Sequence, residues 1–147
     1  MSTQQKVIRD AIVARLTTEL AGLVAPEHIF RAPERDLAES EYPAVCVFSH
    51  GDRPANPDDN TDGQHRRIYT VRIEVVANGR PQEDATDALA VAVRRALLAD
   101  DSLPSASWVP SAWAISWSNQ IWSGHEGETA EALTALDFDV FYLWRPE

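Results

Sequence analysis

The stretch Arg67-Ile-Tyr-Thr-Val-Arg-Ile-Glu-Val-Val-Ala77 decides the fold, because its apolar and polar side chains alternate with a period of two. Such alternation is typical of a strand with one face in the core and the other in solvent. A second alternating stretch follows later, at Leu136-Asp-Phe-Asp-Val-Phe-Tyr-Leu-Trp144. We expect both to be long antiparallel strands around a shared core.

Two segments carry helical periodicity. Residues 4–23 place apolar side chains at spacings of four and three, which makes one stripe on an α-helix: Ile8, Ile12, Leu16, Leu20 and Leu23. Gly22 and Pro26 mark its end. Residues 83–100 begin with carboxylates and continue with small apolar residues suited to packing on a sheet. Both helices are expected to cover the apolar face of the strands.

Three further segments are predicted strands: a short one at residues 28–31, a fully buried one at 42–48 near the sheet centre, and a long one at 113–122. A polar connection, residues 123–132, follows the last of these. The sequence therefore predicts a single α+β domain over residues 1–147. Its sheet is mainly antiparallel, with four to five strands, two α-helices on one face and a long polar loop at residues 49–66.

Composition excludes several classes of function. The chain has 147 residues and a formal charge of -10, which argues against binding nucleic acid through its phosphates. It has no apolar run long enough for a signal peptide or a membrane span, so synthesis in the cytoplasm is expected. The single cysteine, Cys46, lies in an apolar run and is predicted to be a buried thiol.

Four of the five tryptophans fall between Trp108 and Trp122. Trp113 and Trp117 share a face of the predicted strand with Ile115, which favours a place in the core. Trp108 and Trp122 lie off that face, and exposed tryptophan is typical of contact surfaces. We therefore expect these two to contribute to a subunit interface.

Two groups of polar residues are candidates for chemical sites. Asp58, Asn60 and Asp62 match the opening of a calcium loop, but Tyr69 stands where the closing glutamate belongs, so a solvated acidic loop is the favoured interpretation. The second group sits in polar segments without metal-ligand spacing: His50, His65, His125, Asp52, Glu126 and Glu128. With no catalytic motif in the chain, neither an enzyme nor a cofactor is predicted.

The order of these elements resembles the tail-terminator and tail-completion proteins of long-tailed bacteriophages, such as the lambda minor tail protein U. The resemblance spans nearly the whole chain and rests on hydrophobic patterns. The segments that carry it are the helix at 4–23, the entry Tyr42-Pro43-Ala44-Val45, the strand at 67–77 with the helix at 83–98, and the ending from Gly127-Glu128 to Tyr142.

This resemblance implies a structural virion protein of a phage or prophage. Its subunits would form a hexameric ring that terminates the tail tube and offers the surface for joining the head, without catalysis. The implied partners are other copies of the chain, the tail tube protein and head-tail connector proteins; the implied locations are the host cytoplasm during assembly and then the virion tail. The expected contact residues are Asp52, Arg53, Asp62, His65, Trp108, Trp122, His125 and Glu126.

Two alternatives stay open. A head-tail connector or baseplate adaptor would share the lack of an active site. A small cytoplasmic ligand-binding or enzymatic α+β domain would instead use a pocket lined by Trp108, Trp113 and Trp117.

Overall fold

The structure is a computed structural model that describes residues 3–33, 37–56, 65–78, 82–98, 108–109, 112–125 and 131–145. It confirms the predicted α+β class. In chain order the elements are α1 (Thr3–Glu19), a 3-10 turn η1 (Pro26–His28), β1 (Ile29–Arg31), a 3-10 turn η2 (Glu39–Glu41), β2 (Ala44–Pro54), β3 (His65–Asn78), α2 (Gln82–Leu97), β4 (Ala112–His125) and β5 (Glu131–Trp144).

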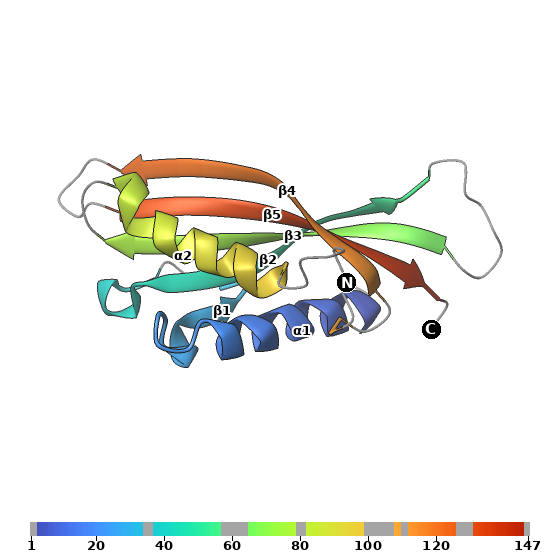
Figure 1. The fold of residues 1–147 in the computed structure, drawn as a ribbon, viewed down its shortest axis with the longest axis horizontal. Coiled ribbons are helices and arrows are strands. Elements are labelled where there is room, and N and C mark those ends of the chain that lie inside the picture. Colours follow the sequence, from blue (N-terminus) through green and yellow to red (C-terminus); the bar gives the residue numbers. More distant parts are fainter. Residues whose placement is uncertain are drawn as a thin grey trace.

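The strands form one five-stranded sheet in the order β1-β2-β3-β5-β4 (Figure 1). The short β1 runs parallel to β2, and the other neighbours pair antiparallel. The two stretches with the clearest alternation, β3 and β5, are central and pair along their full lengths, from His65 opposite Trp144 to Asn78 opposite Glu131. The sheet is therefore mixed, but mainly antiparallel, as predicted.

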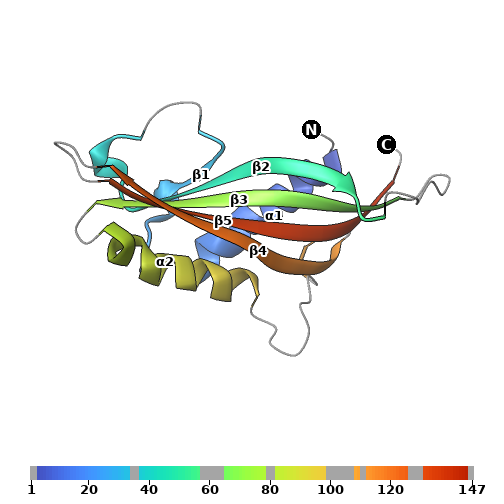
Figure 2. The same cartoon turned by 90° about the horizontal axis from the view of Figure 1, so that it is seen from above.

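Both helices cover one face of this twisted sheet (Figures 1 and 2), which we call the helix face. The predicted stripes supply the core: α1 contributes Ile8, Ile12 and Leu16, α2 contributes Leu89, Val93 and Leu97, and the strands contribute Val45, Val47, Tyr69, Val71, Ile73, Val75, Ile115, Leu136, Phe138, Val140 and Tyr142. Burial of this apolar surface is the main force that holds the helices on the sheet.

The first helix ends before the predicted residue 23, and turns continue the chain as far as the predicted end. Its regular part stops at Glu19, and the amides of Leu23 and Val24 then both donate to the carbonyl of Leu20. Gly22 adopts a φ of 90°, a conformation in which an L side chain is strained. Glycine at this position therefore lets the chain turn back toward β1.

The long polar loop is shorter than the sequence predicted. β2 continues through Pro54 and β3 begins at His65, so residues 49–54, 65 and 66 belong to strands. The sequence did not predict this part of β2 because its side chains are polar and do not alternate with apolar ones. It nevertheless pairs with β3, and a bulge between Ser49 and Gly51 shifts the register of that pairing. Residues 57–64 lie outside the described ranges.

The opposite face of the sheet, which we call the open face, carries polar side chains paired across strands. Arg72 of β3 donates to both carboxylate oxygens of Asp137 on β5, at 2.8 and 3.0 Å. Thr70 donates a hydrogen bond to Asp139 at 2.7 Å. Arg53 of β2 donates to the hydroxyl of Thr70 and to the carboxylate of Asp139. These bonds satisfy the polar groups of three neighbouring strands.

Candidate functional site

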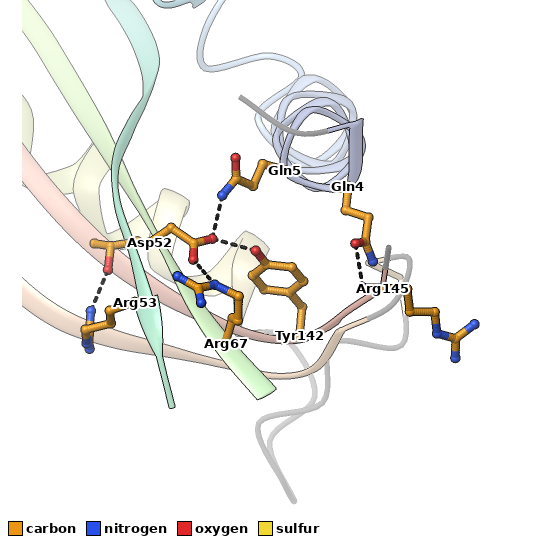
Figure 3. Close-up of polar contacts among 8 residues, drawn as sticks. Gln4, Gln5, Asp52, Arg53, Arg67, Tyr142 and Arg145 are labelled. Atoms are coloured by element: carbon orange, nitrogen blue, oxygen red, sulfur yellow. Dashed lines mark hydrogen bonds and ion pairs between the residues drawn. The ribbon is translucent and has the colours of Figure 1, made fainter. Parts of the chain in front are cut away.

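Asp52 joins four elements at one end of the sheet (Figure 3). Its carboxylate lies on the helix face and accepts hydrogen bonds from Gln5 of α1 at 2.5 Å and from the hydroxyl of Tyr142 of β5 at 2.5 Å. It also accepts a short hydrogen bond from Nε of Arg67 on β3, with which it forms an ion pair. We call these four residues the Asp52 cluster.

The cluster is shielded from water. Only 15% of the Asp52 side chain and 28% of the Arg67 side chain are exposed. Burial, followed by the bond to Asp52, raises the pKa of Tyr142, so its phenol stays protonated and donates to the carboxylate. Because side chains from α1, β3 and β5 all donate to this one carboxylate of β2, the cluster acts as a structural bond between α1 and the sheet.

A second polar contact fixes the start of α1 to the end of β5. Nε2 of Gln4 donates to the carbonyl of Leu143 at 2.9 Å, and the amide of Arg145 donates to Oε1 of Gln4 at 2.9 Å (Figure 3). The side-chain amide thus pairs with the backbone as a neighbouring strand would. The first turn of the helix is therefore held at both Gln4 and Gln5.

Sequence reasoning missed the partners of Asp52, although a signal was present. Arg67 is in phase with Tyr69 and Val71, so a charged side chain had to lie on the apolar face. A charge in such a place requires a counterion, and a tyrosine hydroxyl at the end of an apolar face usually finds a partner. What the sequence could not show was which carboxylate would meet Arg67 and Tyr142.

The outer strand β4 presents the other notable surface. It pairs only with β5 among the described residues, and along its 14 residues it has no aspartate, glutamate, lysine or arginine. Four large apolar side chains on it are about half exposed: Trp113 (47%), Trp117 (42%), Ile121 (44%) and Trp122 (50%). We call this the β4 edge.

Its tryptophans lie on both sides of the sheet. On the helix face, the guanidinium of Arg94 from α2 lies 4.4 Å from the ring centroid of Trp117 and donates to Gln120 at 2.9 Å. On the open face, Trp113 packs near Phe141, with 6.3 Å between ring centroids. There it lines a hollow of about 390 Å³ with Arg66 and Leu143.

These positions correct the predicted burial of two tryptophans, and the interface expected at Trp108 stays a prediction. Trp113 and Trp117 were expected in the core, but both are substantially exposed, and the bulge between Ala112 and Ala114 places Trp113 on the side of the sheet opposite Trp117. Trp108 packs against the core with Arg15 over its ring, at 5.5 Å from the centroid. Because these side chains point in different directions, they do not line one pocket.

The other predicted residues separate into two groups at opposite ends of the sheet. Asp52, Arg53 and His65 lie where β2 ends and β3 begins, whereas Trp122 and His125 lie where β4 ends. His65 pairs with Trp144 and His125 with Glu131, so the length of β5 separates the two histidines by about 40 Å. A histidine cluster is thus excluded. Asp58, Asn60, Asp62, Glu126 and Glu128 lie outside the described residues.

Within the described ranges, no three histidine, cysteine or carboxylate side chains come together as a metal site would require. No helix in the same part of the chain is both long and apolar enough to cross a bilayer.

Comparison with known proteins gives a fold relationship. No protein-family model matches the sequence, and no curated protein matches it significantly. Among solved structures, the chain is similar to one from the virion of a native gene transfer agent (GTA) particle, with a TM-score of 0.60 and 16% identity over 98% of this chain and 100% of that one. A second solved chain, for which no function is named, has a TM-score of 0.55 and 14% identity over 99% of this chain and 100% of that one. At such identities the shared property is the fold.

Proposed function

We propose that the protein is a structural subunit of a phage or phage-like particle, which forms a ring that terminates the tail tube and joins it to the head. The observation that carries this proposal is the likeness over the full length of both chains to a component of a gene transfer agent virion. That likeness agrees with the tail-terminator resemblance drawn from the pattern of the sequence. On this proposal the chain has no catalytic role.

The shape of the sheet supports a role between two partners. The polar ends that contain His65 and His125 lie at opposite ends of long strands. In a ring whose strands run along the channel, one end meets the tail tube and the other meets a connector protein. The formal charge of -10 fits a ring through which DNA passes, since an acidic wall repels phosphates.

The Asp52 cluster gives such a subunit a rigid frame. It holds α1, β2, β3 and β5 together at the end of the sheet where β2 leaves toward residues 57–64. A contact surface mounted on a fixed frame loses less conformational entropy when it binds. The predicted contact residue Arg53 at this end therefore projects from an ordered base, and His65 begins the strand beside it.

The test is to measure the mass of the purified protein by light scattering over a range of concentrations, alone and mixed with phage tail tubes, and to image the largest species in negative stain. We expect sixfold rings with a central hole, or rings seated on tube ends. A protein that stays monomeric in both conditions would overturn the proposal. Rings that bind connector proteins but not tubes would instead support the connector alternative.

A further inference from the structure

The β4 edge lacks the features that normally keep an edge strand from binding another strand. Natural edge strands are short or carry charges, prolines or inward-pointing lysines, because their free amides and carbonyls otherwise pair with other chains. β4 has 14 residues, no charged side chain and four exposed large apolar side chains. Such an edge is expected to be covered in the working assembly.

The opposite edge of the sheet offers a matching strand. β1 covers only residues 45–47 of β2, so the next part of β2, residues 48–54, pairs with β3 alone among the described residues. Since β2, β3, β5 and β4 alternate in direction across the sheet, β4 is antiparallel to β2. A second copy in the same orientation would therefore present residues 48–54 to β4 as an antiparallel neighbour.

The register within one subunit places the two edges at the same height. Trp117 of β4 is level with Phe138 of β5, Val71 of β3 and Ser49 of β2. The first half of β4 thus lies at the level of residues 48–54 of β2, and the second half lies at the level of β1. The bulge between Trp117 and Asn119 falls near this boundary, where β4 must bend to pass the β1 of a neighbour.

Charge favours this head-to-tail arrangement over pairing of two β4 edges. The last turn of α2 beside β4 carries Arg94 and Arg95. Two β4 strands related by a twofold axis would bring these arginines together. The described side chains of the short elements η1, β1 and η2 at the other edge include two carboxylates and one guanidinium: Glu27, Glu41 and Arg31. Opposite charges therefore meet only when different edges meet.

We propose that β4 of one subunit pairs antiparallel with residues 48–54 of β2 in the next copy of this chain, so that the sheets join head to tail. This inference rests on the proposed function, because a head-to-tail contact closes into a ring when its rotation closes. In the closed ring the first half of β4 and residues 48–54 of β2 pair with each other, so these parts of the two sheet edges no longer lie open. Trp113 and Trp117 then flank the incoming strand on the open face and the helix face.

The first test adds a charge to the edge. Trp113→Lys places a cation where Arg53 of the next copy would lie, and we expect the dissociation constant for assembly to rise by at least ~10-fold. The matched control is Leu23→Lys, because Leu23 is 59% exposed and lies outside the sheet, so its assembly should be unchanged. Both variants should keep the circular dichroism spectrum of the wild type. Equal assembly of the two variants would overturn the proposed interface.

The second test uses crosslinking. Ser118 is exposed on β4 and His50 is exposed on β2 at nearly the same height, while the native Cys46 is buried. A chain with both Ser118→Cys and His50→Cys, treated with a short bismaleimide, should give a ladder of covalent oligomers that ends at the ring. Each single variant should stay uncrosslinked. Dimers from Ser118→Cys alone would show pairing of two β4 edges and overturn the head-to-tail contact.

The two proposals fail in different ways. The wild type could form rings while the double-cysteine chain gives no ladder and Trp113→Lys assembles normally. That result would overturn this interface and leave the proposed ring function in place. A wild type that forms no ring, alone or on tail tubes, would overturn the proposed function and this contact with it.

Discussion

The hydroxyl of Tyr142 donates a hydrogen bond to Oδ2 of Asp52 at 2.5 Å, across 90 positions of the sequence. The same carboxylate binds Arg67 and Gln5, so one side chain connects the first helix to three strands. This contact decides where α1 begins on the sheet. It also explains why an aspartate in a polar stretch turns inward.

Removing the carboxylate should be far more harmful than removing one of its donors. We expect Asp52→Ala to lower the free energy of unfolding by about 3 kcal/mol, because it leaves the largely buried Arg67 without its counterion. Tyr142→Phe should cost about 1 kcal/mol, the value of one hydrogen bond. Urea denaturation measures both.

The control is Arg53→Ala, at the next position in the sequence. The exposed ion pair of Arg53 with Asp139 is worth less than about 1 kcal/mol. Equal losses of stability for Asp52→Ala and Arg53→Ala would contradict this account.

Thr86 of α2 and Thr134 of β5 share a buried hydrogen bond of 2.6 Å. Thr134→Val keeps the shape but removes one partner, and we expect a loss of about 1–2 kcal/mol. Combining it with Thr86→Val should cost less than the sum of the two single changes, because no unpaired hydroxyl is then left from this bond. A thermodynamic double-mutant cycle measures the coupling. Strict additivity would show that the bond does not hold α2 on β5.

Asp137 should contribute to the loss of stability in acid. Hydrogen bonds from Arg72 hold its pKa below the usual value, so its contribution is complete above about pH 4 and is lost as the pH falls through the folded pKa. Asp137→Asn should therefore be less stable than the wild type by about 2 kcal/mol at pH 7, and this difference should shrink below pH ~4. Unfolding in urea across this pH range measures it. A difference for Asp137→Asn that stays constant across this pH range would refute the assignment.

Cys46 should be inert in the folded protein. Burial is the main cause that raises its thiol pKa to about 12, with smaller contributions from Glu74 and Glu41, so almost no thiolate exists at pH 8. We expect a thiol reagent such as Ellman's reagent to modify the native chain very slowly and the denatured chain completely. Rapid modification without denaturant would show that β2 opens readily at this position.

Much of the fold could be predicted from local pattern. The alternation in β3 and β5 identified Tyr69, Val71, Ile73, Phe138 and Val140 as one buried face, and the structure confirms it. The stripe on the first helix likewise named four core residues correctly, Ile8, Ile12, Leu16 and Leu20, but Leu23, predicted in the same stripe, is exposed. Periodicity is reliable here because a strand or helix that buries one side must repeat its apolar residues at the period of its own geometry.

The contact surfaces were harder to predict. Trp113 and Trp117 were expected to share a buried face with Ile115, but the bulge between Ala112 and Ala114 turns Trp113 to the open face, and Trp117, which keeps the face of Ile115, is exposed on the outer strand. A bulge depends on how β4 pairs with β5, and its own sequence does not reveal it. For the same reason Asp52, assigned to a loop, became part of a strand.

The sequence by itself determined the secondary elements, the residues of the core and the absence of a recognisable catalytic motif, because these depend on the order and spacing of neighbouring residues. Only the tertiary structure decided the strand order, which leaves β4 at an edge, and the inward turn of Asp52 toward Tyr142. Both depend on pairing between segments far apart in the chain. The free energy of burying a charge, or of leaving a strand edge open, depends on the distant segments that pair with it. The local sequence pattern does not show which segments these are.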